Sequence, residues 1–178
     1  MGTLKINKSS SLITAKKVIE LKIEAFKNLK KSINKNFDNA VNTIVSCQSK
    51  IILCGVGKSG LIATKIAATM SSVGCPAFSL SANDCLHGDL GSITRKDVLI
   101  LISNSGKSEE IIPIIKFANR NKIKLIGIVS KKSSVLYKAS DIKILLPEVK
   151  ESGLGIVPTS STSVQLAIGD ALAIASLN

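Results

Sequence analysis

The first quarter of the chain carries apolar residues at spacings of three and four positions, with polar and basic residues between them. The series runs from Ile13 to Val45. Because such spacings place side chains on one face of an α-helix, we predict helix over residues 13–49. The pattern allows one long helix, or two helices separated by a break near Asn34–Asn39.

Beyond residue 49 the pattern changes to short, fully apolar runs that alternate with helical segments. Strands are expected at residues 50–54, 77–80, 98–102, 125–129 and 142–146. Helices are expected at residues 61–73, 108–119, 133–139 and 160–177. Uninterrupted apolar strands that alternate with helices are typical of a parallel sheet covered on both faces. We therefore predict an α/β domain over residues 13–178 with five parallel strands, preceded by a flexible N-terminus over residues 1–12.

The composition is that of one ordinary globular domain. A chain of 178 residues, 45% apolar and 20% charged, buries roughly 70% of its unfolded surface on folding. Aromatic residues make up only 3% and Trp is absent, which argues against the stacking platforms that bind single-stranded nucleic acid. No apolar run approaches the roughly 20 residues of a membrane span.

The net charge of +12 comes almost entirely from lysine, which supplies 22 of the 24 basic residues. Ten of these lysines lie in residues 1–50, against three carboxylates. A solvated, lysine-rich helical face explains this distribution. A footprint for nucleic acid or another acidic surface, and an anionic small-molecule substrate, are the open alternatives. Base readout relies on the planar guanidinium of Arg, and this sequence has only two Arg, so we do not expect a nucleic-acid partner. Because no apolar run is long enough to span a membrane, we expect no membrane partner either.

The cysteine and histidine content disfavours a metal centre. The four cysteines have no C-x-x-C spacing, and His87 is the single histidine. A structural zinc site needs four such ligands at short spacings, so no metal is expected. Cysteines without a disulfide framework are typical of a reducing compartment, which predicts a cytoplasmic protein.

The loops that follow the predicted strands carry the candidate chemistry, because ligands of open parallel sheets bind at the carboxyl ends of the strands. The first loop, Gly55–Gly60, fits the G-x-G-x-x-G pattern formally. However, no acid ends the next strand, and Ile52 stands where a P-loop needs glycine. Glycines, a helix N-terminus and the Lys58 ammonium still favour an anion. The alternative is a tight strand-to-helix turn without a ligand.

A serine-rich loop follows the third predicted strand. Residues 103–110 read Ser-Asn-Ser-Gly-Lys-Ser-Glu-Glu. Three hydroxyls, a glycine and a helix N-terminus within six residues suit a phosphomonoester. The alternative is a serine-rich helix cap.

Three further loop segments carry ionisable or hydroxyl groups. His87 precedes Gly88 and Asp89, where an imidazole can act as acid or base near neutral pH or make a structural hydrogen bond. Glu151 follows the last predicted strand in a glycine-containing loop, as a candidate base or an exposed carboxylate. The segment Pro158–Thr162 supplies hydroxyl donors at the start of the final helix.

Five motifs occur in the order Gly55–Gly60, His87–Gly91, Ser103–Gly106, Pro158–Thr162 and Gly169–Ala173. Together they resemble the SIS (sugar isomerase) domain of the D-arabinose-5-phosphate isomerase family over most of the chain. The resemblance implies a three-layer α/β/α sandwich whose five-stranded parallel sheet has flavodoxin-like order. It also implies interconversion of D-ribulose 5-phosphate and D-arabinose 5-phosphate, which supplies 3-deoxy-D-manno-octulosonate for lipopolysaccharide synthesis.

The functional positions of the family correspond to Lys58, His87, Glu110 and Glu151 in this sequence. The resemblance further implies a reaction without a cofactor and a homotetramer in which neighbouring subunits complete each site. Longer members of the family extend beyond the part that corresponds to these 178 residues. Their additional segment carries another active-site His and is often followed by paired CBS domains.

The expected reaction moves a proton between C1 and C2 of the sugar through an enediolate. Glu151 is the preferred base, with Glu110 as its competitor. Lys58 would stabilise the enediolate, and His87 would assist ring opening or hydroxyl proton transfer. Substrate contacts, chiefly to the phosphate, are expected from Gly57, Ser59, Ser103, Asn104, Ser105, Gly106, Ser108, Thr159, Ser160 and Ser161.

Three other functions stay open. A non-catalytic sugar-phosphate-binding regulatory module would bind the ligand without exchanging the C2 proton in heavy water. A related ketose-phosphate isomerase, such as a 6-phospho-3-hexuloisomerase, would act on another sugar. A basic nucleic-acid binder would show steep salt dependence, although no recognition element supports it.

Overall fold

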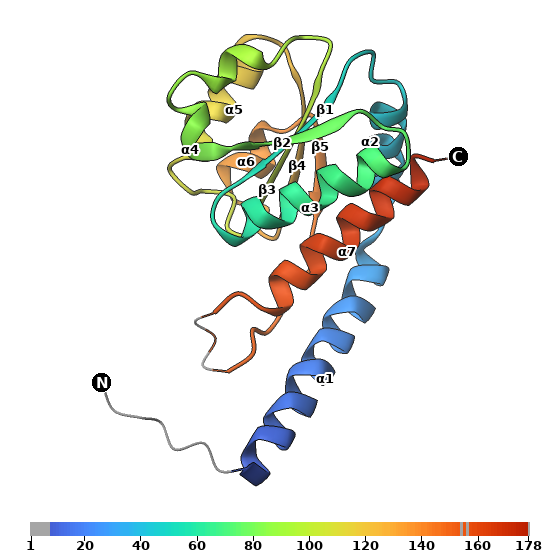
Figure 1. Ribbon diagram of the computed structural model, residues 1–178, viewed down its shortest axis with the longest axis vertical. Coiled ribbons are helices and arrows are strands. Elements are labelled where there is room, and N and C mark those ends of the chain that lie inside the picture. The colour runs from blue at the N-terminus through green and yellow to red at the C-terminus, as the bar shows by residue number, and fades with distance from the viewer. Residues whose placement is uncertain (1–7, 154, 156, 178) are drawn as a thin grey trace.

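The computed structural model describes residues 8–153, 155 and 157–177. Its centre is a five-stranded sheet, which the helices surround in Figure 1. All neighbouring strands pair in parallel, in the order β2-β1-β3-β4-β5. The strands are β1 (Ile51–Gly55), β2 (Ala77–Ser81), β3 (Val98–Ser103), β4 (Lys124–Val129) and β5 (Ile142–Leu145). The predicted five-stranded parallel sheet of flavodoxin-like order is confirmed, and its strand order reverses between β1 and β3.

Helices cover both faces of the sheet and complete the three-layer sandwich (Figure 1). One face carries α1 (Lys8–Ser32), α2 (Lys35–Val45), α3 (Lys58–Ser72) and α7 (Ser160–Ala175). The opposite face carries α4 (Ala82–Cys85), α5 (Ile111–Arg120) and α6 (Val135–Ala139), with the short 3₁₀ helix η1 (Asp89–Ser92) beside α4.

Strand β3 shows why the central strands are apolar at every position. Successive strand side chains point to opposite faces, so Ile100 and Ile102 pack in the layer of α3 and α7. Leu99 and Leu101 pack instead in the layer of α4, α5 and α6. All six residues of β3 are buried, because helices cover both of its faces.

The element boundaries depart from the sequence prediction in a few places. The N-terminal helical region is two helices, and the break lies at residues 33–34, at the start of the predicted range. The short elements α4 and η1 were not predicted, since neither is long enough to show a helical period. Of the N-terminal segment predicted to be flexible, residues 1–7 lie outside the described part of the chain, whereas α1 begins at Lys8.

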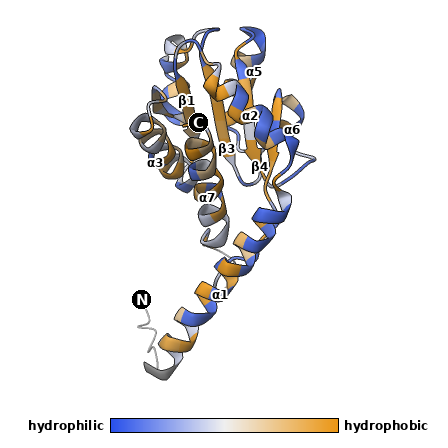
Figure 2. Cartoon of the chain, turned by 90° about the vertical axis from the view of Figure 1, so that its right-hand side faces the viewer, coloured by the Kyte–Doolittle hydropathy of each residue, from blue (hydrophilic) through white to orange (hydrophobic). Residues whose placement is uncertain are grey.

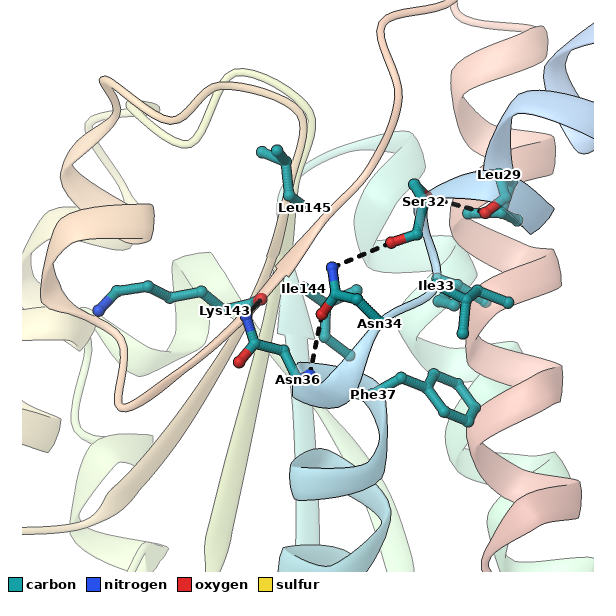
Figure 3. Close-up of a pocket in the computed structure, with 10 residues that line it drawn as sticks. Leu29, Ser32, Ile33, Asn34, Asn36, Phe37, Lys143, Ile144 and Leu145 are labelled. Atoms are coloured by element: carbon teal, nitrogen blue, oxygen red, sulfur yellow. Dashed lines mark hydrogen bonds between the residues drawn. The ribbon is translucent and has the colours of Figure 1, made fainter.

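The break between α1 and α2 is a helix cap that two asparagines make (Figure 3). The side-chain oxygen of Asn34 accepts a hydrogen bond of 2.9 Å from the backbone N–H of Asn36, which satisfies a free donor of the first turn of α2. The amide of Asn36 donates to the carbonyl of Lys143 at 3.0 Å. Because Lys143 lies in β5, this bond fixes the start of α2 to the edge of the sheet.

The N-terminal half of α1 extends beyond the sheet, while its C-terminal half packs beside α7 (Figure 2). Ala25 and Leu29 are buried in the core. Leu12, Ile13 and Ile19 are all more than half exposed, so the apolar stripe of this helix is only partly covered within one chain. No helix in the described ranges combines the length and apolar content that crossing a membrane requires.

A buried carboxylate joins the starts of β1 and β3. Asp97 is 1% exposed, and its side chain accepts hydrogen bonds from the backbone N–H of Thr94 at 2.6 Å and the ammonium of Lys50 at 3.2 Å. Burial acts to raise the pKa of Asp97, but the hydrogen bonds from Thr94, Ser49 and Lys50 outweigh it and lower that pKa. The carboxylate is therefore ionised and paired at the amino edge of the sheet.

Candidate functional site

Loops from three parts of the sequence meet at the carboxyl edge of the sheet and enclose a cavity of about 310 Å³. The loop after β1, the loop after β3 and the approach to α7 each contribute to its wall. The lining residues are Val56, Lys58, Ser59, Asn104, Glu151, Gly155, Pro158, Ser161, Thr162 and Gln165. The cavity lies beside the reversal of strand order between β1 and β3, the usual ligand position in open α/β sheets.

The glycines of the first loop bring the end of β1 against the first turn of α3. A Cβ on Gly60 would lie 2.8 Å from the carbonyl oxygen of Gly55, closer than packed atoms approach. Gly57 has a φ of +57°, a conformation that other residues rarely adopt. These glycines therefore make the tight strand-to-helix turn, and the same turn places Lys58 and Ser59 on the cavity wall.

The serine loop after β3 is held by its own side chains. The hydroxyl of Ser103 accepts a hydrogen bond of 3.0 Å from the backbone N–H of Gly106, and the hydroxyl of Ser130 donates to the side-chain oxygen of Asn104 at 2.7 Å. Gly106 has a φ of +64°, and a Cβ there would collide with the side chain of Ser134. Asn104 is the residue of this loop that lines the cavity.

Glu151 caps the N-terminus of α7. Its Oε2 atom accepts hydrogen bonds of 2.7 Å from the backbone N–H groups of both Thr159 and Ser160, and one of 3.0 Å from the Thr159 hydroxyl. The backbone N–H of Ser161 donates to Oε1 at 3.3 Å. A carboxylate in this position satisfies the free donors of the first helical turn and interacts favourably with the helix dipole.

This capping arrangement also governs the protonation of Glu151. Burial acts to raise the pKa of its carboxyl, but interactions with the side chain of Ser161, with the N–H and hydroxyl of Thr159 and with the N–H of Ser160 lower it more. The net shift is downward, so the group is an ionised carboxylate at neutral pH and a weaker proton acceptor than an ordinary glutamate.

Glu151 takes part of the site at the start of α7 that is expected to hold a phosphate. The phosphate is expected to bind the hydroxyls of residues 159–161, but the Thr159 hydroxyl donates to Glu151. The same carboxylate also accepts hydrogen bonds from the backbone N–H groups of these three residues. The hydroxyl of Ser160 is fully buried without a hydrogen-bond partner among the described atoms.

The other predicted site residues lie around the cavity or apart from it. Ser103, Ser105 and Ser108 belong to the serine loop but do not line the cavity, and Glu110 is half-buried just before α5. His87 is exposed in the turn between α4 and η1, and it too is outside the described cavity wall. Within one chain, Lys58 and Glu151 are thus the predicted ionisable groups that share this cavity.

Sequence reasoning missed Gln165, which lines the cavity from the second turn of α7. The available signal was its spacing of four from Ser161, which puts both residues on one face of the helix. A single Gln in an apolar helix does not by itself indicate a ligand contact. Across the described part of the chain, no group of three or more His, Cys, Asp or Glu side chains is placed to hold a metal ion.

The strand order and the cavity together define a flavodoxin-like α/β domain with a lysine-bearing cavity at the carboxyl edge of its sheet. The SIS domain model matches residues 44–175. The chain therefore belongs to the SIS domain family, as its motifs suggested.

Characterised relatives agree with this assignment. Arabinose 5-phosphate isomerase KdsD of Yersinia pestis is 43% identical over 163 residues, which are 91% of this chain and 50% of that protein. Arabinose 5-phosphate isomerase KdsD of Francisella tularensis is 42% identical over 178 residues, covering 98% of this chain and 54% of that protein. The chain thus spans about half the length of the curated relatives it matches.

A solved structure shares nearly the whole fold. The structure of E. coli CFT073 c3406 in complex with arabinose 5-phosphate superposes with a TM-score of 0.91 at 35% sequence identity, and the match covers 97% of this chain and 92% of that one. The similarity to this structure thus extends over almost all of both chains.

Proposed function

We propose that the protein is an aldose–ketose isomerase that interconverts D-ribulose 5-phosphate and D-arabinose 5-phosphate. The observation that carries the proposal is the common cavity of Lys58, Ser59, Asn104 and Glu151, which three separate loops bring together. Its volume of about 310 Å³ is at the lower end of the range for small-molecule sites. The similarity to isomerases named for arabinose 5-phosphate supports the choice of substrate.

The cavity supplies the two kinds of group that the reaction needs. A base must move a proton between C1 and C2, and a cation or donor must stabilise the enediolate oxygen that forms. Lys58 is an exposed ammonium at the start of α3, where it can stabilise developing negative charge. Glu151 is ionised at neutral pH, which is the protonation state a base requires.

The occupied cap of α7 indicates where the phosphate binds. Because Glu151 already takes the backbone donors of residues 159–161, a second anion there would repel it. We place the phosphate at the serine loop after β3, next to the part of the cavity that Asn104 of this loop lines. Ser103, Ser105 and Ser108 and the N-terminus of α5 would be its donors. This assignment leaves Glu151 in the cavity beside the sugar carbons.

The remaining roles need groups from outside one chain's cavity. In the proposed homotetramer, neighbouring subunits complete each site, and His87 assists ring opening or hydroxyl proton transfer. The exposed apolar residues of α1 supply surface for such an assembly. We further propose that the enzyme acts in the cytoplasm, where its product enters 3-deoxy-D-manno-octulosonate and lipopolysaccharide synthesis.

A second function, sugar-phosphate binding without catalysis, is favoured by one observation. The carboxylate of Glu151 receives hydrogen bonds from three consecutive residues, and this lowers its affinity for a proton. A SIS domain whose carboxylate serves only as a helix cap would bind the ligand and leave its C2 proton in place.

One assay separates the two functions. The 178-residue chain is incubated with D-ribulose 5-phosphate in heavy water, and NMR follows both deuterium incorporation and aldopentose phosphate formation. An isomerase incorporates deuterium and forms D-arabinose 5-phosphate, and Lys58→Met should suppress both. Binding without either signal supports the regulatory function, and formation of a different aldose phosphate contradicts the proposed substrate.

A further inference from the structure

Gln165 is a fully buried amide at the cavity wall. Its relative exposure is 0%, although it lies among the residues that line the cavity. It belongs to the second turn of α7, four residues after Ser161, which lines the same cavity. The amide therefore lies within the wall of the cavity and has no solvent-exposed surface of its own.

Only one end of this amide has a hydrogen-bond partner. The hydroxyl of Ser59 donates to Oε1 of Gln165 at 3.1 Å. The Nε2 atom is buried without a partner among the described atoms. Because Ser59 holds the oxygen, the two N–H donors of Nε2 are left for an acceptor outside the protein.

A buried hydrogen-bond donor without an acceptor destabilises a fold, and nearly all buried donors in folded proteins have an acceptor. An apolar side chain of similar length, such as Met, would fill the same space in α7 without that loss. The hydroxyls of Ser152 and Ser160 are also buried and unpartnered, but neither residue lines the cavity. Gln165 is thus distinguished by an unpartnered donor in a residue that belongs to the cavity wall.

We propose that Gln165 donates a hydrogen bond from Nε2 to an oxygen of the sugar part of the bound pentose phosphate, and so helps to determine specificity. This inference rests on the proposed function of the cavity. A neutral amide suits a hydroxyl or carbonyl oxygen, whereas the phosphate dianion is served by the serine loop and its helix N-terminus. The Ser59–Gln165 bond fixes the orientation of the amide and joins α3 to α7 behind the ligand.

Two substitutions isolate the donor. Gln165→Glu keeps an oxygen for Ser59 but replaces the donor by a second acceptor, and Gln165→Met removes both polar atoms at nearly constant volume. The matched control is Gln48→Met, at an exposed glutamine between α2 and β1. Binding of D-arabinose 5-phosphate is measured by calorimetry, binding of inorganic phosphate by competition, and folding by thermal unfolding.

A specific pattern of results is expected. Gln165→Met should weaken D-arabinose 5-phosphate binding about tenfold, because the ligand oxygen loses its partner in a buried site. Inorganic phosphate should bind as well as before. The melting temperature should change little, because the loss of the Ser59–Gln165 hydrogen bond offsets the removal of the unpartnered donor. Gln165→Glu should weaken binding of the sugar phosphate further, since its added charge shares the cavity with Glu151. Gln48→Met should leave each affinity within about twofold of the unsubstituted chain, because it lies outside the cavity.

Other outcomes overturn the inference or the proposed function separately. Unchanged sugar-phosphate affinity in Gln165→Met, or an equal loss for inorganic phosphate, overturns the role of Gln165 alone. If the unsubstituted chain binds D-arabinose 5-phosphate but does not turn it over, the proposed reaction fails, while a weaker Gln165→Met still supports the contact. If the unsubstituted chain does not bind the sugar phosphate, both are wrong.

Discussion

The Oε2 atom of Glu151 lies 2.7 Å from the backbone nitrogen of Ser160, so a loop carboxylate after the last strand closes the N-terminus of the last helix. This relationship joins the candidate chemistry to the stability of the fold. A substitution at Glu151 therefore acts on both, and the two effects need separate measurements.

The pH dependence of stability should report this cap. The pKa of Glu151 is lower in the folded chain than its ordinary value, so the folded state binds its proton less well than the unfolded state. The stabilisation is therefore complete above the unfolded pKa of about 4.3, and is lost as pH falls through the lower folded value. Thermal unfolding of the wild-type chain and Glu151→Gln should differ at neutral pH and converge in acid. A constant difference at all pH values would contradict the cap.

Turnover should distinguish the two candidate bases. A well-placed base contributes about 10²–10⁴-fold, so Glu151→Gln should reduce kcat by that factor with little change in KM. Glu110→Gln serves as the comparison, because Glu110 lies outside the cavity wall of one chain. A loss below about threefold in Glu151→Gln, together with a large loss in Glu110→Gln, would transfer the role to Glu110. Steady-state kinetics with D-ribulose 5-phosphate make the measurement.

The serine loop should act on binding rather than on chemistry. Ser105 is half-buried in the loop between β3 and α5. Ser105→Ala removes a hydroxyl that, in the proposed phosphate site, contacts the substrate before the reaction begins. We expect KM to rise roughly tenfold with kcat nearly unchanged. Ser163→Ala, in the first turn of α7 and away from the loop after β3, is the matched control. Equal KM values for the two variants would contradict phosphate binding at this loop.

The buried ion pair at the opposite edge should matter for folding alone. Asp97→Ala leaves the N–H of Thr94 and the ammonium of Lys50 without their acceptor, which should lower the free energy of unfolding by about 3 kcal/mol. Glu148→Gln breaks an ion pair whose two side chains are largely exposed, so its effect should stay within about 1 kcal/mol. Urea unfolding compares the two. Similar losses in the free energy of unfolding for the two variants would show that burial of Asp97 does not increase the stability that its ion pair contributes.

The strands were predictable because each is a short, largely apolar run, uninterrupted from Val98 to Ile102 in β3, and the parallel sheet follows from their alternation with helices. The two short elements between β2 and β3 escaped prediction because four residues carry no period. The capping role of Glu151 was not predicted for another reason. The cap depends on a loop that brings Glu151 back to Thr159, eight residues later in the sequence. Gln165 became a candidate only when burial showed that one end of its amide is paired and the other is not.

The division of the apolar core by the sheet has a consequence for how the chain can change. Ile66 and Leu172 pack in one layer, whereas Ile111 and Leu136 pack in the other, and the backbone of the sheet stands between them. Replacements made in opposite layers share no neighbours, so their energetic effects should simply sum. Each layer can thus accumulate substitutions without compensating substitutions in the opposite layer.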